Sequence, residues 1–384
     1  MPEPTIRLIA ADRVIADDRD LSPGVVEIER GRIASVREGR ASGADIALSG
    51  GILSPGLIDL QINGAARVDF LTGGEAEFDR VRRYLLSTGT TAFLPTLITA
   101  PLSHLEAALD RWETQRGGVP RVLGVHLEGP FLNPAHAGAH EVRALRPPRP
   151  AELRRLLARR PHLVKILTLA PELRGAGALI REARARRVVA AAGHTAATYD
   201  EARAAFDAGV RLVTHLFNAM RPLRHRDPGV VAAALLDPRV TVSLIADLVH
   251  VDAAVLRLVL SAKPWKRIAL ITDAVAAAGS LGRTSRLAGR RLRITDAPRL
   301  PDGTLAGSVL RMDQAVRNVV RLGIPMRDAV RMASTVPAAL LGRRDLGRIA
   351  AGARADFVLF DRRLRVRVVL VDGVVVHRSD HRGG

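Results

Sequence analysis

Eight short apolar runs alternate with stretches of helical period between residues 57 and 272, and this alternation constrains the fold more than any other feature. Repeated strand–helix units build parallel sheets, because each helix returns the chain to the edge where the next strand begins. Eight such units are the number that closes a (β/α)8 barrel of the TIM type. The expected strands cover residues 57–61, 92–95, 123–127, 164–169, 188–192, 212–215, 242–245 and 268–272.

The segments between these strands carry apolar residues at the spacing of amphipathic helices that cover a barrel. The clearest are residues 77–88, 103–116, 151–160, 175–187, 199–208 and 253–260. An open doubly wound sheet is the alternative architecture for the same pattern. That architecture has a glycine-rich phosphate loop at the start of its first helix, and the sequence has none there. The closed barrel is therefore favoured.

Both ends of the chain have a different, β-type pattern. Residues 5–48 alternate apolar and polar positions in short pieces, and residues 356–376 do the same around the turn Asp372-Gly373. Two β segments at opposite ends of a chain most simply pair with each other. We therefore expect residues 1–53 and 345–384 to form one small β-sandwich domain, and residues 54–344 to form the barrel that carries catalysis.

The composition excludes several classes of protein. The formal net charge is +19, but the arginines are spread along the chain and only 3% of the residues are aromatic. Nucleic-acid binders gather positive charge on one element and stack bases on aromatic rings, so we expect no specific nucleic-acid partner. The absence of cysteine excludes disulfides and thiol catalysis. Without a recognisable signal peptide or an apolar run of about 18 residues, we expect a cytoplasmic protein and no membrane partner.

Four polar side chains follow four different expected strands. Glu128 comes after the third strand, His194 after the fifth, His215 at the end of the sixth and Asp273 after the eighth. Each has an ordinary local explanation, such as a turn histidine or a helix cap. The carboxyl ends of barrel strands, however, all meet at the face where barrel active sites lie. The sequence therefore predicts that the four side chains converge.

A carboxylate and two imidazoles form a ligand set that leaves a zinc coordination position open for water. Such a centre activates water for hydrolysis at neutral pH. Asp273 is then the expected proton acceptor and donor. His140 is a candidate to polarise a substrate carbonyl, whereas His126 is expected to be an interior residue of the barrel.

These motifs resemble those of the N-acetylglucosamine-6-phosphate deacetylases of the amidohydrolase superfamily. The similarity runs through nearly the whole chain, and the HLEGP and HLFNAM pair is its most specific part. Leu346-Gly-Arg-Ile-Ala-Ala-Gly352 is typical of the superfamily's return to its small β domain. The other segments that carry the resemblance are Ser54-Pro-Gly-Leu-Ile-Asp-Leu-Gln-Ile-Asn-Gly64, His126-Leu-Glu-Gly-Pro130, Gly193-His-Thr195, His215-Leu-Phe-Asn-Ala-Met220, Ala246-Asp-Leu-Val-His250 and Thr272-Asp-Ala274.

The resemblance implies hydrolytic removal of the acetyl group from N-acetyl-D-glucosamine 6-phosphate, with Glu128, His194 and His215 as metal ligands. It implies Asp273 as the general acid and base, and His140 near the acetamido carbonyl. It also implies a homodimer, in which Arg226 reaches towards a neighbouring site. The substrate-binding residues that it implies are Ala139, His140, Asn218, Ala219, Arg226, His250, Ala306 and Gly307.

The first expected strand departs from the wider superfamily pattern. It ends in Gln61-Ile-Asn63, where relatives with that pattern have His-x-His and hold a second metal. Amide side chains are poor zinc ligands beside imidazole. We therefore expect one divalent metal per chain, most simply Zn²⁺.

Other functions fit parts of the same pattern. The substrate could be N-acetylgalactosamine 6-phosphate, which differs at one hydroxyl, or the N-acyl group of another amidase substrate. A non-catalytic barrel that serves as a scaffold is expected to lose a metal ligand or Asp273, and this sequence keeps all four residues. The retained set favours an enzyme.

Overall fold

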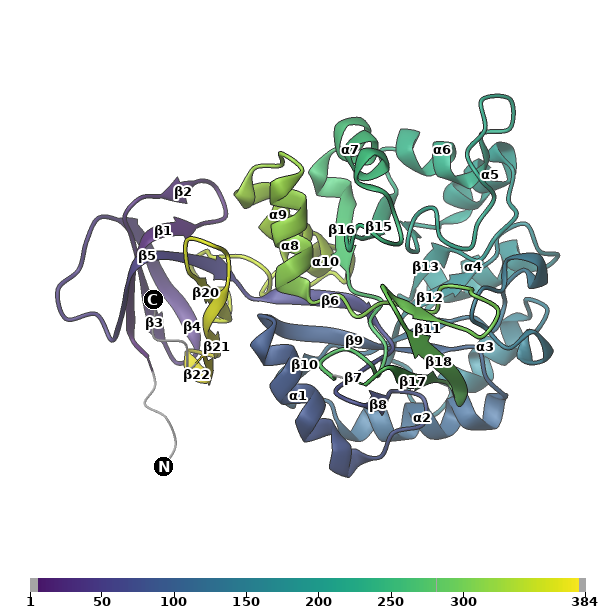
Figure 1. Ribbon diagram of the computed structural model, residues 1–384, viewed down its shortest axis with the longest axis horizontal. Coiled ribbons are helices and arrows are strands. Elements are labelled where there is room, and N and C mark those ends of the chain that lie inside the picture. The colour runs from purple at the N-terminus through teal and green to yellow at the C-terminus, as the bar shows by residue number, and fades with distance from the viewer. Residues whose placement is uncertain (1–5, 281, 380–384) are drawn as a thin grey trace.

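The computed structural model describes residues 6–280 and 282–379. Eight parallel strands form the expected barrel, with helices around its outside (Figure 1). The third strand is interrupted, because β10 (Arg121–Val122) and β11 (Val125–Glu128) both pair with β9. The other barrel strands are β6 (Leu57–Ile62), β9 (Thr90–Ile98), β12 (Val164–Leu169), β13 (Val189–Ala192), β14 (Leu212–Val213), β15 (Thr241–Ile245) and β16 (Ile268–Ile271).

The barrel closes between β16 and β6 through backbone hydrogen bonds at the carboxyl ends of these two strands. The Asp273 N–H donates to the Gln61 carbonyl at 2.8 Å, and the Asn63 N–H donates to the Ala274 carbonyl at 2.7 Å. The closing bonds thus run through residues of the expected site. The (β/α)8 fold predicted from the sequence is confirmed.

The predicted amphipathic helices form with small shifts at their ends. The helix that starts at Tyr199 begins with a capping box. The Thr198 hydroxyl accepts from the Glu201 N–H, and the Glu201 carboxylate accepts from the Thr198 N–H. The helices that follow the first seven barrel strands are α1 (Phe78–Ser87), α2 (Leu102–Thr114), α3 (Pro150–Leu157), α4 (Ala176–Ala185), α5 (Tyr199–Ala208), α6 (Gly229–Leu236) and α7 (Ala253–Ala262).

After β16, the chain makes an excursion that the sequence pattern did not predict. Three short antiparallel strands, β17 (Thr284–Leu287), β18 (Arg290–Ile294) and β19 (Pro298–Arg299), form a separate small sheet. The chain then continues through α8 (Met312–Arg321), α9 (Met326–Met332) and α10 (Thr335–Leu340). No helix within 6–280 and 282–379 has the length and apolar character needed to cross a membrane.

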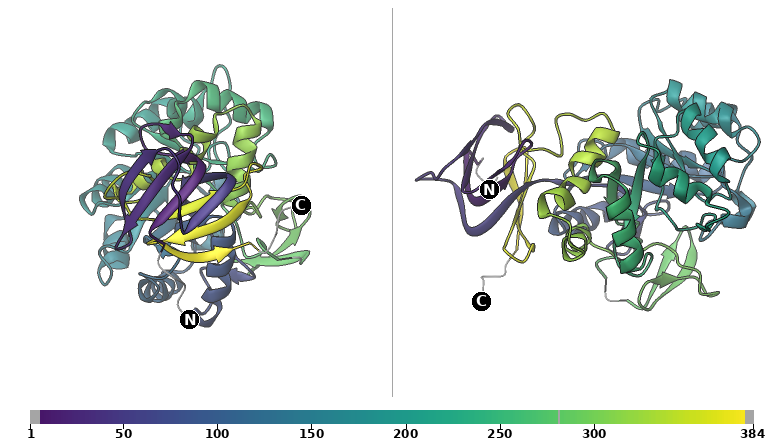
Figure 2. Two further views of the ribbon diagram at one scale, coloured as in Figure 1. Left: turned by 90° about the vertical axis from the view of Figure 1, so that its left-hand side faces the viewer. Right: turned by 90° about the horizontal axis from the view of Figure 1, so that it is seen from above.

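Strands from both chain ends share a second sheet, as predicted, and Figure 2 shows them side by side. Its strand order, β22-β21-β20-β5-β1-β3-β4 with β2 paired to β1, makes one continuous sheet around its own apolar core. Residues of β20 and β21 also join the main core and so fix this sheet to the barrel. The strands are β1 (Leu8–Ile15), β2 (Asp20–Leu21), β3 (Gly24–Glu29), β4 (Arg32–Glu38), β5 (Ile46–Pro55), β20 (Phe357–Phe360), β21 (Val366–Val371) and β22 (Val374–Arg378).

Candidate metal centre and active site

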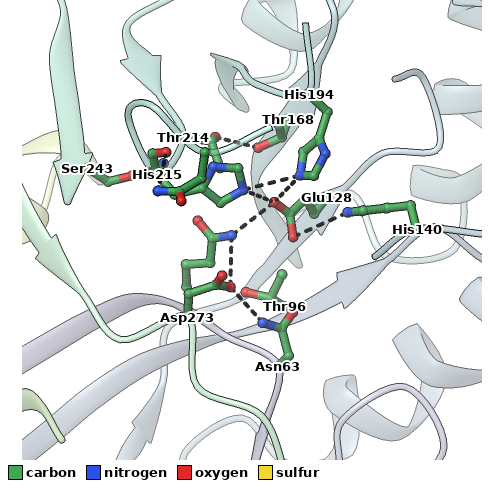
Figure 3. A network of polar contacts seen from close by, with 12 residues as sticks. Asn63, Thr96, Glu128, His140, Thr168, His194, Thr214, His215, Ser243 and Asp273 are labelled. Carbon is green, nitrogen blue, oxygen red and sulfur yellow. Dashed lines mark hydrogen bonds and ion pairs between the residues drawn. The ribbon is translucent and has the colours of Figure 1, made fainter. Parts of the chain in front are cut away.

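Glu128, His194 and His215 meet at the carboxyl ends of their strands (Figure 3). Glu128 Oε1 lies 2.9 Å from His215 Nε2 and 3.2 Å from His194 Nε2, and the two imidazole nitrogens lie 3.2 Å apart. All three side chains are at least nine-tenths buried. The structure therefore brings together the three side chains that the sequence pattern expected to converge.

The backbone bends sharply where three of the expected site residues occur. His194, His215 and Asp273 adopt φ angles of 49°, 31° and 49°, in the left-handed region that non-glycine residues rarely occupy. Strained backbone of this kind costs on the order of 1–3 kcal/mol per residue and clusters at functional sites. Here it ends each strand abruptly and leaves the side chain at the strand mouth.

The proton arrangement shows that the cluster fits a cation. His194 Nδ1 lies 2.9 Å from the His136 carbonyl, which only accepts hydrogen bonds, so Nδ1 carries the proton and Nε2 presents a lone pair. That lone pair faces the carboxylate of Glu128 at 3.2 Å. Two acceptors at this distance need a proton or a cation between them. Glutamate and imidazole are the ligands that a divalent metal such as zinc takes.

The electrostatics of the pair Glu128 and His215 support the same conclusion. Burial opposes ionisation of Glu128, but the neighbouring imidazoles of His194 and His215 lower the pKa of that carboxyl well below its usual value. Burial also disfavours the charged form of His215, yet the Glu128 carboxylate raises the pKa of that imidazole. Glu128 thus stays ionised although it is buried, and a positive group beside it, an imidazolium or a bound cation, balances its charge.

Asp273 lies beside this cluster and is held by two side-chain amides. Its Oδ1 accepts from Asn63 Nδ2 at 2.7 Å and from Gln61 Nε2 at 3.2 Å. Burial, followed by the charge of Glu128, raises the pKa of Asp273 to about 6. A carboxyl group with a pKa near neutrality is suited to general acid–base chemistry.

The amide of Gln61 connects the two carboxylates. Its Nε2 donates to Glu128 Oε1 at 3.0 Å as well as to Asp273. Gln61 and Asn63 therefore act as hydrogen-bond donors to the carboxylates of this site.

His140 occupies the other side of Glu128, with Nε2 3.8 Å from Glu128 Oε2. The Thr99 N–H donates to His140 Nδ1 at 3.2 Å, so this nitrogen accepts and the imidazole proton lies on Nε2. Burial lowers the pKa of His140 to about 3, which keeps the ring neutral at pH 7. His140 therefore presents an N–H donor on the side of the cluster.

His126 is an interior residue of the barrel. Its Nδ1–H donates to the Leu60 carbonyl at 3.1 Å, and its Nε2 accepts from the Thr168 hydroxyl at 2.7 Å. Burial lowers the pKa of His126 to about 4, so the ring is neutral. Both ring nitrogens are occupied, which leaves no atom for a metal.

A cavity of about 380 Å³ opens over the cluster. This volume suits a small organic ligand. The residues expected from the sequence that form its wall are Glu128, Ala139, His140, His194, His215, Asn218, Ala219, His250, Asp273 and Gly307.

Two expected binding residues lie elsewhere. Ala306 is fully buried in a separate apolar cluster beneath the excursion, so its neighbours Leu305 and Gly307 line the cavity in its place. Arg226 is exposed, and its guanidinium contacts His225 Nε2 at 2.8 Å outside the cavity wall. Within one chain, the structure does not bring Arg226 to the cluster.

The excursion after β16 contributes wall residues that the sequence pattern missed. Leu287 from β17 lines the cavity together with Thr304, and His136 lines it from the loop after β11. Arg290 of β18 donates to the Ala139 carbonyl at 2.8 Å and so ties the excursion to the loop that carries His140. The excursion has only a short apolar alternation in the sequence, Leu292-Arg-Ile294, which is too brief to identify a strand by itself.

Comparison with known proteins gives a consistent result. The model of the Amidohydrolase family matches residues 52–376. N-acetylgalactosamine-6-phosphate deacetylase of Escherichia coli O157:H7 is 40% identical, over 84% of this chain and 87% of its own. N-acetylglucosamine-6-phosphate deacetylase of Bos taurus is 37% identical, over 96% of this chain and 92% of its own.

Solved structures agree. N-acetyl-D-glucosamine-6-phosphate deacetylase from Mycobacterium smegmatis, solved in complex with N-acetyl-D-glucosamine-6-phosphate, superposes with a TM-score of 0.93 at 37% identity, covering 97% of this chain and 100% of that one. The fold and the cluster of candidate metal ligands at its strand ends define a hydrolase of the (β/α)8 class. The chain belongs to the amidohydrolase family, as the sequence motifs predicted.

Proposed function

We propose that this protein hydrolyses the N-acetyl group of N-acetyl-D-glucosamine 6-phosphate to give D-glucosamine 6-phosphate and acetate, as a step in amino-sugar catabolism and recycling. The observation that carries the proposal is that Glu128, His194, His215, His140 and Asp273 all line one cavity of about 380 Å³. Relatives at 35–37% identity over nearly the whole chain bear the name of this deacetylase. In this proposal, residues 54–344 form the catalytic domain.

Glu128 Oε1 and the Nε2 atoms of His194 and His215 would hold one divalent metal per chain, which we propose is Zn²⁺. When bound, the metal would activate a water ligand and polarise the acetamido carbonyl. Two of the ligands are held before binding: the imidazole of His194 by the His136 carbonyl, and the backbone of His215 by its amide N–H, which donates to the Ser243 hydroxyl at 2.8 Å.

The remaining groups handle protons and orientation. Gln61 and Asn63 occupy Oδ1 of Asp273, so Oδ2 takes the proton of the attacking water and passes it to the amine nitrogen as the C–N bond breaks. The Nε2–H of His140 donates to the carbonyl oxygen of the acetamido group, where negative charge develops. Because the ring is neutral, this donor keeps its proton throughout.

Asn218, Ala219 and His250 form the part of the wall that we assign to the sugar phosphate. His250 Nδ1 bonds Asp247 at 2.7 Å, which fixes the ring and leaves Nε2 for the substrate. We further propose that two copies of the chain pair, so that the exposed Arg226 of one copy reaches the phosphate in the other. The proposed location is the cytoplasm.

Deacetylation of N-acetylgalactosamine 6-phosphate is the second candidate. It is favoured by the 40% identity to the Escherichia coli enzyme of that name. The two substrates differ only in the configuration at one hydroxyl.

Acetate release from a small panel of compounds tests both proposals. The panel contains the 6-phosphates of N-acetylglucosamine and N-acetylgalactosamine, unphosphorylated N-acetylglucosamine and N-acetylated amino acids. We expect the highest kcat/KM on N-acetylglucosamine 6-phosphate. A preference for the galactosamine compound selects the second candidate. Acetate release from the amino acids alone would overturn both.

A further inference from the structure

A second cavity, of about 830 Å³, lies between α8 and the loop that follows β20, and none of its lining residues belongs to the cluster of candidate metal ligands. Figure 1 shows α8 on the side of the barrel that faces the terminal sheet. We call this the arginine cavity. Its charged lining residues are Arg311, Asp313, Arg317, Arg321, Arg362, Arg363 and Arg365, and His377 also lines it.

The positive charge of the arginine cavity is largely unopposed. Asp313 is the one carboxylate among its described lining residues. Arg311 and Arg317 already share it, at 3.0 and 2.7 Å. The other four lining arginines form no ion pair with any residue in the described ranges. Several like charges around one concave surface create a strong positive potential.

The backbone that carries these arginines is fixed in advance. Asp361 Oδ1 accepts from the N–H groups of Arg363 and Arg365, both at 2.9 Å, and its Oδ2 accepts from Arg367 at 2.8 Å. Arg317 donates to the Leu364 carbonyl at 2.7 Å and so ties this loop to α8. A ligand would therefore meet a preorganised site and order little backbone on binding.

Guanidinium groups match phosphate oxygens in pairs, so a cluster of them favours a ligand with several phosphates. The volume of the arginine cavity suits a small molecule. Its described lining contains no Phe, Tyr or Trp, so bases would find no ring on which to stack, as single-stranded nucleic acid requires. A compact chain of phosphates is thus favoured over a nucleic acid.

We propose that the arginine cavity binds a linear oligophosphate, either free or as the phosphate chain of a nucleoside triphosphate. The ligand bridges Arg321 on α8 and Arg363 beside the terminal sheet. It neutralises their mutual repulsion and ties the sheet to the barrel. The site shares no lining residue with the catalytic cavity.

Isothermal titration of the metal-loaded enzyme with sodium tripolyphosphate tests the proposal, with thermal melting as a second measurement. We expect one saturable site per chain and a higher melting temperature with ligand. The double variant Arg321→Gln/Arg363→Gln should bind at least about tenfold more weakly, because each lost guanidinium removes charge-assisted hydrogen bonds to phosphate. Its ligand-free melting temperature should not fall, since neither side chain forms an ion pair or a hydrogen bond with the residues that the structure describes.

The matched control is Arg184→Gln/Arg187→Gln. These two arginines line another basic cavity, of about 440 Å³, at the amino ends of the barrel strands. The control removes the same net charge and should bind tripolyphosphate like the unmodified protein. Tripolyphosphate could also remove the catalytic metal, but this would affect the unmodified protein and both double variants equally, so a difference between the variants still reports on the arginine cavity.

Adenosine triphosphate in place of tripolyphosphate separates the two ligand sources. Equal affinity shows that only the phosphate chain is recognised, and tighter binding of the nucleotide shows that its nucleoside contributes. Absence of saturable tripolyphosphate binding would overturn the proposal, and so would an equal loss of affinity in both double variants. The proposal is also wrong if the protein binds a duplex DNA oligomer through Arg321 and Arg363 but does not bind tripolyphosphate.

Discussion

Asp59, inside the barrel on β6, accepts a hydrogen bond from the hydroxyl of Thr272 at 2.5 Å, across the closure between β6 and β16. The same carboxylate accepts from the Thr272 N–H and from the Gln61 N–H, both at 3.2 Å. Thr272 precedes Asp273, and Gln61 donates to it. Asp59 therefore helps to position Asp273, the proposed proton carrier, by fixing Thr272 and Gln61.

Above about pH 7, where Asp59 is ionised, its replacement by Asn should lower kcat by about tenfold or more, because charge-assisted hydrogen bonds contribute about 1.5–3 kcal/mol and their loss lets Asp273 shift. The bound metal should remain near the unmodified level, since no ligand is touched. Elemental analysis beside steady-state kinetics distinguishes this from general damage: a loss of metal in proportion to kcat would contradict a positioning role.

The same substitution should change how stability depends on pH. Burial raises the pKa of Asp59 from 3.8 to about 7. Between these values the native protein keeps a proton that the unfolded chain has lost, so this group's contribution is present below about pH 4 and is lost as pH rises through about 7. The loss is up to about 1.4 kcal/mol per pH unit. Urea unfolding at pH 5 and 7.5 should show that the free energy of unfolding falls less between these pH values in Asp59→Asn than in the unmodified protein. An equal fall in both proteins would rule the effect out.

Asp273→Asn tests the proton transfer itself. The amide keeps the shape and the hydrogen bonds of the side chain but cannot accept a proton. We expect kcat to fall by about 10² to 10⁴, the usual contribution of general acid–base catalysis. Metal content and KM should stay close to normal. Near-normal turnover would refute the assignment, whereas loss of metal would make Asp273 a ligand.

Metal analysis tests the single-metal proposal. Gln61 and Asn63 donate hydrogen bonds to carboxylates, so we expect one tightly held ion per chain. Glu128→Gln should lose most of it, because the variant removes the charged ligand. Two tightly bound ions in the unmodified protein would show that the amides do not exclude a second site.

Mixing two variants tests the pairing of chains. Arg226→Ala should raise KM for the phosphorylated sugar and leave the unphosphorylated one unaffected. If Arg226 serves the other copy, then a mixed dimer of Arg226→Ala and Asp273→Asn chains contains one intact site. Dissociation and reassociation of the mixture should restore activity above that of either variant. Activity in a verified mixed dimer that stays no higher than that of the variants would show that Arg226 does not serve the site of the other copy.

The barrel and its strand-end residues could be predicted because both follow from local pattern. Buried strands alternate with amphipathic helices. Glu128 is the last residue of its strand, and His194 and Asp273 come two residues after theirs. Helix α6 was missed because it is apolar on all sides and shows no helical period. Strands β17 and β18 were missed because they are short and rich in arginine.

Relationships between distant residues could not be predicted from pattern. The partner of Asp59 lies 213 residues away in the sequence, so its role is visible only in the folded chain. The motif around Arg226 likewise carries no information on its distance from the cavity. Residue type and spacing thus predict which groups meet at a strand end, but not what holds them there.

The pairing of β5 with β20 has a consequence for biosynthesis. Ser54 on β5 bonds to the carbonyl of Val358 on β20, 304 residues further along the chain. At typical translation rates of about 5–20 residues per second, that interval lasts roughly 15 to 60 s. The amino-terminal strands therefore leave the ribosome well before β20 exists, and the edge of β5 that pairs with β20 has no strand partner during that interval.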